Sequence, residues 1–236
     1  MRPTEKKMHW LKSACLVACF AGAAQMAHAG VVVGGTRVVY EGAKKEASIS
    51  VDNSDKATPY LIQSWVEDAS GAKAVQAPFI MTPPLFRLDG GQENMLRIIR
   101  TGGQFADDKE SVFWINIKAI PSSEKSDANT LQISVKTRIK LFFRPAGLPG
   151  TAADAYKALV FARNGDQLQV NNPTPYYVSF YRISVGDKEI KDPGMVAPRS
   201  NLTLPVPNGS SGRVSWQSIN DYGGVSDTAS ADRFTF

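Results

Sequence analysis

The sequence predicts an all-β protein made of two sandwich domains. Short segments rich in Val, Ile, Tyr, Phe and Trp recur along the chain with apolar and polar residues in alternation, which is typical of half-buried strands. Gly, Pro, Asn and Asp separate these segments, and no amphipathic helix interrupts the series. The 236 residues suffice for two modest domains, each large enough to bury a core.

The first 29 residues are predicted to be a secretory signal peptide. A basic start is followed by the apolar run Ala14–Ala24, and Ala27 and Ala29 form an A-x-A cleavage pattern. We therefore expect export and cleavage after Ala29. An alternative is lipoprotein processing at Cys19, but the apolar run before that residue is short for a signal. No later segment is long enough to span a membrane, so we expect no membrane insertion.

Removal of this leader would exclude several classes of chemistry. The chain has two cysteines and two histidines, and all four precede residue 30: Cys15, Cys19, His9 and His28. The exported chain would then lack Cys nucleophiles, Ser-His-Asp triads, disulfides and Cys- or His-ligated metals, and we expect no cofactor. It would keep 23 of the 27 basic and 21 of the 22 acidic residues, a net charge of +2. Such weak basicity does not favour nucleic-acid binding.

The predicted strands fall into two series. The first comprises Val31–Tyr40, Ala47–Val51, Tyr60–Val66, Asn94–Ile99, Val112–Ile120 and Leu131–Phe143. The second comprises Leu159–Ala162, Gln167–Asn171, Tyr176–Val185, Asn201–Val206, Gly212–Ile219 and Arg233–Phe236. The Pro- and Gly-rich stretch 144–150 separates them and is the best linker candidate, because both residue types interrupt strand pairing. We therefore expect an N-terminal domain at residues 30–148 and a C-terminal domain at residues 149–236.

One acidic cluster has the composition of a paired-carboxylate catalytic site. Asp107, Asp108 and Glu110 are close in sequence, as acid–base catalysis by carboxylates requires. They occupy a polar segment before a strand, however, where Asp commonly caps a turn and faces water. We interpret the cluster as a turn and predict no enzymatic activity.

The last strand of the first series is unusually long. The run from Asn129 to Arg144 is about twice the ordinary strand length, and Leu131, Ile133 and Val135 alternate with polar residues in its first half. Periodicity alone favours the interpretation that these three side chains face the core of the first sandwich. A second interpretation is an edge strand that lends its apolar side chains to another polypeptide.

Two basic residues lie within strand-like stretches. Taken singly, Arg37 and Lys140 are each typical of solvated cations. If the fold brought them together, their mutual repulsion in the free protein would create an anion-binding site. The sequence alone does not establish whether they are close.

Several motifs resemble those of one protein family. The segment Phe105–Pro121 reads FADDKESVFWINIKAIP, and four supporting motifs occur elsewhere in the chain: Thr36–Tyr40 before it, and Arg138–Pro145, Val170–Tyr177 and Ile219–Gly224 after it. The long segment resembles the signature of the periplasmic pilus chaperones of chaperone–usher systems. Together the five motifs span nearly the whole exported chain, so the resemblance does not depend on one short pattern.

The resemblance implies a fold and three sets of site residues. The fold would be two immunoglobulin-like β-sandwiches in an L- or boomerang-shaped arrangement with an inter-domain cleft. The implied sites are a carboxylate anchor of Arg37 and Lys140, a donor strand with Leu131, Ile133 and Val135, and an inter-domain salt-bridge network of Glu110, Arg144 and Asp221. Strict alternation places Lys140 on the opposite face from Leu131, and a bulge or bend between them would bring them to one face.

The resemblance also implies a function without catalysis. Such a chaperone binds, folds and stabilises pilus subunits by donor-strand complementation and delivers them to the outer-membrane usher; when free it can self-associate to cover its apolar strand. The nine-residue segment 122–130 resembles the short loop of one subclass. The alternative function is an exported adhesive or carbohydrate-binding module, which would expose aromatic residues. We predict instead that Trp65, Trp114 and Trp216 belong to the core.

Overall fold

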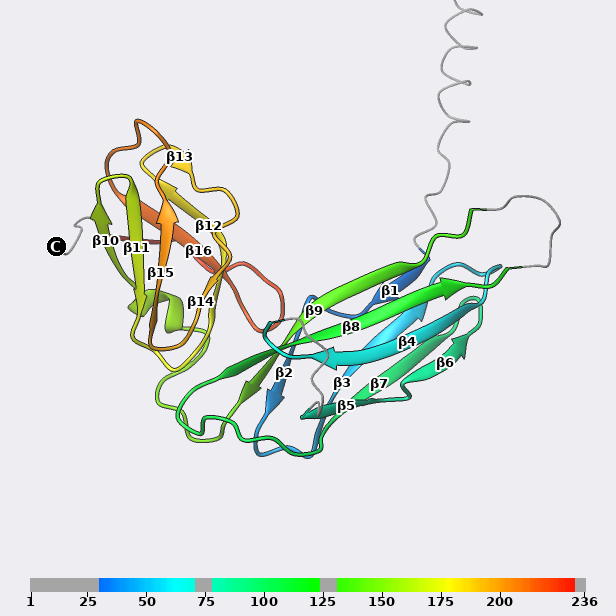
Figure 1. Cartoon of the computed structure of the whole chain (residues 1–236). Coiled ribbons are helices and arrows are strands. Elements are labelled where there is room, and N and C mark those ends of the chain that lie inside the picture. Colours follow the sequence, from blue (N-terminus) through cyan, green and yellow to red (C-terminus); the bar gives the residue numbers. More distant parts are fainter. Residues whose placement is uncertain (1–29, 71–77, 124–130, 232–236) are drawn as a thin grey trace, which may run out of the picture. The chain divides into compact units, whose positions relative to one another are not determined.

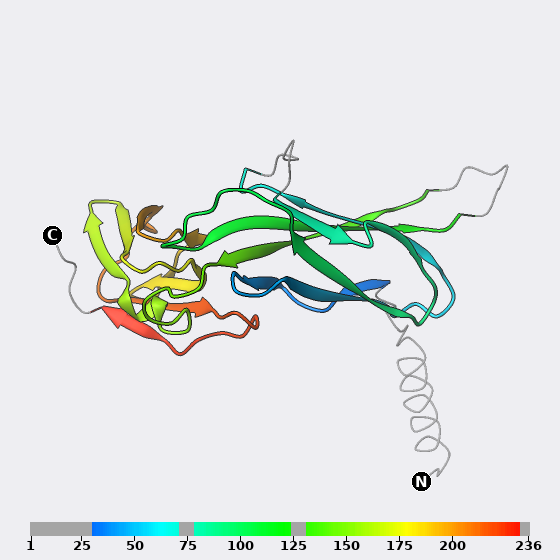
Figure 2. The same ribbon diagram turned by 90° about the horizontal axis from the view of Figure 1, so that it is seen from below.

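The regular structure of the protein is almost entirely β (Figure 1). The computed structural model describes residues 30–70, 78–123 and 131–231. The first sandwich has one sheet in the order β1-β3-β7-β5 and a second in the order β2-β9-β8-β4-β6. Its strands are β1 (Val31–Val33), β2 (Arg37–Glu41), β3 (Glu46–Asn53), β4 (Tyr60–Glu67), β5 (Phe79–Thr82), β6 (Leu85–Leu88), β7 (Glu93–Arg100), β8 (Ser111–Pro121) and β9 (Val135–Arg144). Figure 2 shows the two sheets as stacked layers.

Alternate residues of both sheets fill the core of this sandwich, as the period-2 pattern predicts. Ile115 and Ile117 of β8 and Leu141 of β9 are fully or almost fully buried, and so are Val51 and Leu96 from the facing sheet. Polar residues occupy many of the intervening positions and face outward. The core therefore determines which face of β8 and β9 remains available for binding.

The predicted strand Val31–Tyr40 is in fact two strands on different sheets. β1 pairs antiparallel with β3, whereas β2 pairs parallel with β9, the one parallel pairing among the described strands. The chain changes sheets at Gly34, whose N–H donates to Ser50 O at 2.9 Å. A Cβ at position 34 would clash with the Ser50 hydroxyl, so glycine permits this close approach. The sheet change places Arg37 at the start of β2.

Two short strands of the first sandwich are absent from the prediction. β5 and β6 have four residues each, which gives too little alternation to distinguish them from the surrounding Pro- and Gly-containing turns. β5 extends one sheet beside β7, and β6 extends the other beside β4. In strand order, they form the ends of the two sheets opposite β1 and β2.

The second sandwich pairs a three-stranded sheet, β10-β11-β15, with a sheet of β13-β12-β16-β17, in which β14 also pairs with β12. Its elements are the 3₁₀ helix η1 (Ala155–Ala158), β10 (Val160–Asn164), β11 (Gln167–Asn172), β12 (Val178–Val185), β13 (Lys188–Glu189), β14 (Met195–Val196), β15 (Ser200–Pro205), β16 (Val214–Ile219) and β17 (Ala229–Ala231). The prediction of two all-β sandwiches is thus confirmed.

Differences from prediction in this sandwich concern its shortest elements. The sequence did not predict η1, β13, β14 or β17, which have two to four residues each and so little periodicity. The predicted strand Arg233–Phe236 lies outside the described residues. In the described part of the chain, no helix is long and apolar enough to cross a membrane.

Candidate functional site

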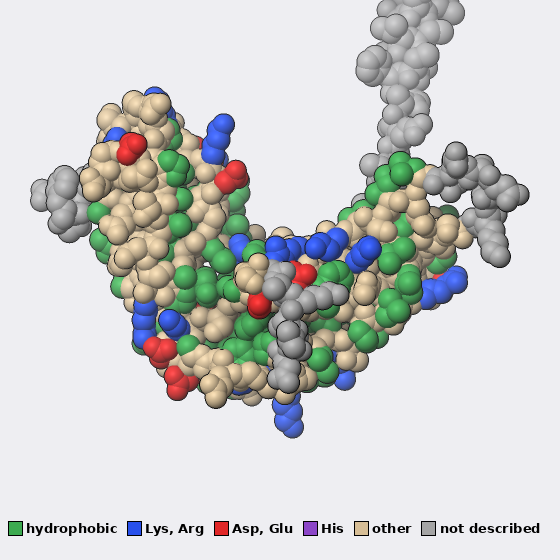
Figure 3. All heavy atoms as spheres, viewed as in Figure 1, with side chains coloured by type: hydrophobic (Ala, Val, Ile, Leu, Met, Phe, Trp, Pro, Cys, Tyr) green, Lys and Arg blue, Asp and Glu red, His purple; other side chains and the backbone are tan. Residues whose placement is uncertain are grey.

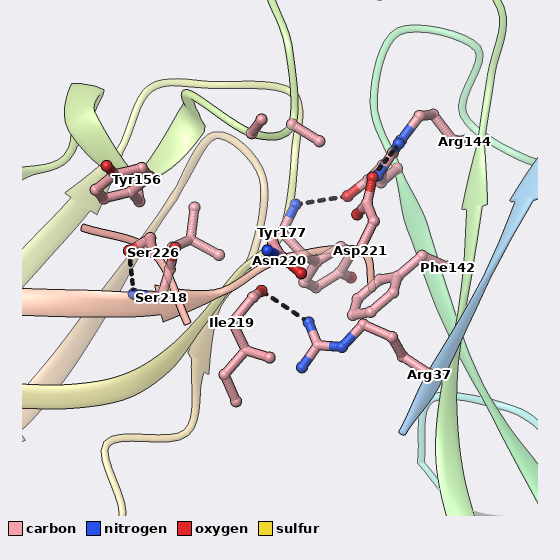
Figure 4. A pocket seen from close by; sticks show the side chains of 14 residues that line it. Arg37, Phe142, Arg144, Tyr156, Tyr177, Ser218, Ile219, Asn220, Asp221 and Ser226 are labelled. Atoms are coloured by element: carbon pink, nitrogen blue, oxygen red, sulfur yellow. Dashed lines mark hydrogen bonds and ion pairs between the residues drawn. The ribbon is translucent and has the colours of Figure 1, made fainter. Parts of the chain in front are cut away.

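The two basic residues singled out in the sequence lie side by side. β2 and β9 run parallel, and their register places Arg37 directly opposite Lys140. The Arg37 Nη1 group donates to the Ile219 carbonyl of β16 at 3.0 Å, and its guanidinium carbon lies 5.8 Å from the centre of the Phe142 ring (Figure 4). Its Nε atom is buried and has no hydrogen-bond partner within the described residues. The guanidinium is therefore fixed in place with unused donor capacity.

Burial and like charge act together on this pair. Burial lowers the pKa of the Lys140 ammonium group below its ordinary value, and the adjacent Arg37 charge lowers it further. Burial also lowers the pKa of Arg37, with the Asp221 carboxylate acting in the opposite direction. Two half-buried cations that repel each other gain stability when an anion binds between them, so the pair has the electrostatics of an anion site.

Leu131, Ile133 and Val135 are strongly exposed, with exposed fractions of 88%, 66% and 60%. The prediction that they face the core is therefore wrong. The predicted strand Leu131–Phe143 is also too long, since β9 begins only at Val135. The pairing with β8 ends where Val135 meets Ala119, and no described strand pairs with residues 131–134.

The pairing of β9 also answers the question of a bulge. Its register against β8 is continuous from Val135 to Phe143, with no shift. Val135 thus shares a face with Ile139 and Leu141, and Lys140 lies on the other face. No bulge brings the apolar row and the basic pair to one face within this strand.

Glu110, Arg144 and Asp221 form a single ion-pair network. The Arg144 Nε atom donates to Glu110 Oε1 at 2.7 Å, and its two terminal nitrogens donate to both oxygens of Asp221 at 2.8 and 2.9 Å (Figure 4). The second Glu110 oxygen accepts the Tyr177 N–H at 2.7 Å. Arg144 and Glu110 belong to the first sandwich, whereas Tyr177 and Asp221 lie within the chain of the second. The bidentate geometry gives the contact a defined orientation.

Glu110 differs from the two acidic residues near it. Asp107 and Asp108 are exposed, as a polar turn predicts, and Asp108 pairs with Arg199. Glu110 is only 4% exposed, so the prediction that it faces water is wrong. Burial raises the pKa of its carboxyl group above the ordinary value, although Arg144 and the Tyr177 N–H act in the opposite direction. The three acids therefore form no catalytic pair.

Two of the three tryptophans that were predicted to be core are placed differently. Trp216 is buried and donates to the Tyr156 carbonyl, which confirms it as core. Trp65 and Trp114 are only half-buried and lie on the outer face of the sheet. The Arg138 guanidinium lies 4.2 Å from the centre of the Trp114 ring. This covered ring does not form the open aromatic surface expected of a carbohydrate-binding module.

Sequence reasoning missed the polar cluster around these tryptophans. Arg138 Nη2 lies 3.5 Å from Glu67 Oε2, and the other Glu67 oxygen accepts the Trp65 indole N–H at 2.9 Å. The alternation of basic residues at positions 136, 138 and 140 was the available signal. Among the described residues, no group of three or more His, Cys, Asp or Glu could hold a metal ion.

Comparison with known proteins decides which family this arrangement represents. Residues 30–149 match the family model described as the pili and flagellar-assembly chaperone, PapD N-terminal domain. Residues 154–230 match the PapD C-terminal domain of pili assembly chaperones. The chain belongs to the pilus-assembly chaperone family. Chaperones of this family work in the periplasm and catalyse no reaction.

Individual relatives agree with this assignment. The chain is 48% identical over 202 residues to the probable fimbrial chaperone LpfB of Escherichia coli O157:H7, covering 84% of this chain and 86% of that protein. It is 42% identical over 202 residues to FimC of Escherichia coli K12, covering 84% and 83%.

Solved structures also resemble the fold. The E. coli chaperone DraB matches with a TM-score of 0.78 and 41% identity over 87% of this chain and 97% of that one. The SafB chaperone of Salmonella enterica, solved in complex with the SafA pilin, matches with a TM-score of 0.80 and 38% identity over 86% and 96%.

Proposed function

We propose that this chaperone captures pilus subunits by donating part of β9 to them and delivers them to an outer-membrane usher. Leu131, Ile133 and Val135 are the proposed donor residues, and Arg37 with Lys140 are the proposed anchor for the C-terminal carboxylate of the subunit. The similar SafB chaperone was solved with a pilin, which supports a pilin as the partner class. The observation that carries the proposal is an open strand edge that ends at the basic pair.

That edge follows from the register of β2 on β9. β2 covers only Lys140–Arg144, and no other described strand pairs with this edge of β9 between Val135 and Ile139. A subunit strand that added to the open part, parallel to β9 like β2 itself, would run towards β2 and end where β2 begins. Its C-terminal carboxylate would then lie beside Arg37 and Lys140.

The donor residues supply the apolar part of the interaction. Burying three such side chains in a subunit groove is worth about 5 to 9 kcal/mol before the cost of association, at about 1.5 to 3 kcal/mol each. The same exposed row gives the free chaperone a reason to self-associate. Hydrogen bonds from the two cations to the carboxylate add about 1.5 to 3 kcal/mol each.

The ion network has a separate proposed role. Glu110, Arg144 and Asp221 would fix how the two sandwiches contact each other, since an Arg held by three carboxylate oxygens accepts few other geometries. A fixed contact keeps Ile219 of the second sandwich against Arg37 of the first. The network thus supports the proposed anchor indirectly.

Processing and domain limits complete the proposal. The A-x-A pattern supports cleavage of the leader after Ala29. The Pro- and Gly-rich stretch 144–150 supports domains at residues 30–148 and 149–236. Mass spectrometry of the exported protein tests the cleavage site directly, since a start at Gly30 is expected.

Co-purification from the periplasm with candidate pilins tests the central proposal. The wild-type protein should yield a one-to-one complex, and Arg37→Ala or Lys140→Ala should lose it while circular dichroism stays unchanged. Lys188→Ala is the matched control, because Lys188 is an exposed cation of the second sandwich. If both anchor variants retained wild-type amounts of complex, the carboxylate would be held elsewhere.

A further inference from the structure

The outer face of the β9 sheet carries a ladder of basic side chains. Even-numbered residues of β9 point away from the core, and three in succession are basic: Lys136, Arg138 and Lys140. The register adds Lys118 of β8 opposite Lys136, and Arg37 of β2 opposite Lys140. Figure 3 shows Lys and Arg side chains gathered in a row on this sandwich.

Acidic residues do little to neutralise the ladder. Each of Lys136, Arg138 and Lys140 pairs with a residue of β8, which pairs in turn with a residue of β4. Glu67 is the only acidic residue among these partners. Glu67 is buried, with a side chain only 10% exposed, and the Trp65 indole N–H occupies one of its oxygens. The face therefore keeps an excess of positive charge.

Arg138 is held in place on this face by two contacts. Its guanidinium stacks 4.2 Å from the centre of the Trp114 ring and touches Glu67 on one side at 3.5 Å. Its side chain is still 38% exposed, so several of its five N–H donors face solvent. A side chain that is already fixed loses little entropy when it binds a ligand.

We propose that this ladder selects pilus subunits with acidic side chains on the outward face of their last strand. The proposal rests on the proposed function, since it uses the same open edge of β9. Because Arg37 occupies the position beside Lys140, the last residue of an added strand lies beside Ile139, and the register places the second residue from the end beside Arg138 and the fourth beside Lys136. A basic residue at either position would face like charge and be rejected.

Synthetic peptides test the charge and the register together. Two dodecapeptides with free C-terminal carboxylates have the same composition but carry Glu at the second and fourth positions from the end, or at the third and fifth. Binding to the exported protein is followed by NMR of the indole N–H signals of Trp65 and Trp114. Trp216 is the internal control, because it is buried in the second sandwich.

The first peptide should bind more tightly than the second, by about threefold for each correctly placed charge pair. The double variant Lys136→Gln with Arg138→Gln should remove this preference, whereas Lys188→Gln should leave it. Added salt should reduce the preference, since both cations are exposed. Equal affinities, the opposite preference, or no shift of Trp65 and Trp114 at millimolar peptide would each overturn the proposal.

Failure of this inference is distinguishable from failure of the proposed function. Lys140→Ala should weaken both peptides alike if Lys140 anchors the carboxylate. Binding that depends on Lys140 but ignores the position of Glu would retain the anchor and reject the charge selection. Co-purification with pilins tests the capture itself, independently of any peptide.

Discussion

The two halves of the segment from Leu131 to Arg144 have the same alternation and opposite surroundings. Leu131, Ile133 and Val135 are 60–88% exposed, whereas Leu141 and Phe143, in the same phase, are almost fully buried. The second half pairs with β8 on one side and β2 on the other, and a second sheet covers its inner face. The first half lacks β2, and no described strand pairs with its residues 131–134.

The difference shows that alternation identifies which side chains share a face of the strand. It does not show whether that face is buried. Apolar residues at every second position indicate that one side of a strand will contact something apolar. Within the described residues, that contact is complete only for the half that lies between β8 and β2. The other half keeps its apolar row for a partner, which is the arrangement expected of strand donation.

The largest loss of stability should come from a change at Arg144, the last residue of β9. Arg144→Ala leaves Glu110 buried without its cation, and we expect a loss of about 3 to 5 kcal/mol in the free energy of unfolding. Urea denaturation of the whole chain measures it. Arg182→Ala is the control, because its ion pair with Glu189 is half exposed and should be worth less than about 1 kcal/mol. Similar losses in both variants would contradict a structural role for the network.

A matched pair of alanine substitutions, one in each half of the segment from Leu131 to Arg144, tests the difference directly. Leu141→Ala removes a fully buried side chain and should lower the free energy of unfolding by about 2 to 5 kcal/mol. Ile133→Ala should change it by less than about 0.5 kcal/mol, because Ile133 is exposed in the free protein. The same Ile133 variant should recover less pilin in periplasmic co-purification. A stable complex at wild-type yield would show that Ile133 is not a donor residue.

The hydrogen bond from the Trp65 indole to Glu67 gives a pH-dependent prediction. A hydrogen bond from Trp65 is the main reason that the pKa of Glu67 lies below its ordinary value, with burial acting in the opposite direction. A lowered folded pKa contributes stability above the ordinary carboxyl pKa, and this stability is lost as the pH falls through the lowered value. Trp65→Phe should therefore cost about 1.5 to 3 kcal/mol at neutral pH, and less in acid.

Urea denaturation of Trp65→Phe at several pH values provides the measurement. The difference from wild type should narrow as the pH falls through the carboxyl range. A difference that stayed constant with pH would assign the loss to packing of the indole ring rather than to its bond with Glu67.

The last prediction concerns the pH dependence of subunit binding at Lys140, where β2 begins to pair with β9. Lys140 must be charged to hold a carboxylate, and burial together with Arg37 lowers its pKa. Subunit binding should therefore weaken as the pH rises through this lowered value, by about tenfold per pH unit above it. Arg37→Gln removes the like charge and should shift the midpoint to higher pH, even though overall affinity falls. An unchanged midpoint would show that Arg37 does not influence Lys140.

The sequence by itself determined much of this protein. Alternation in β3, β4, β8 and most of β9 predicted the strands, since side chains in a strand point to opposite faces whatever lies around them. The Pro- and Gly-containing stretch 144–150 separated the two series of strands for an equally local reason. The ordered motifs predicted the family, which the comparisons confirmed.

Only the tertiary structure decided which residues meet. The parallel pairing of β2 with β9 brings Arg37 to Lys140, although 103 positions separate them in sequence. The fold also buries Glu110 against Arg144, leaves Leu131 exposed, and turns Trp114 outward beneath Arg138. Burial and charge pairing depend on segments distant in the chain, and no local pattern contains them. Alternation could therefore indicate the faces of β9, but the neighbouring strands determine which half is covered and which is free to bind.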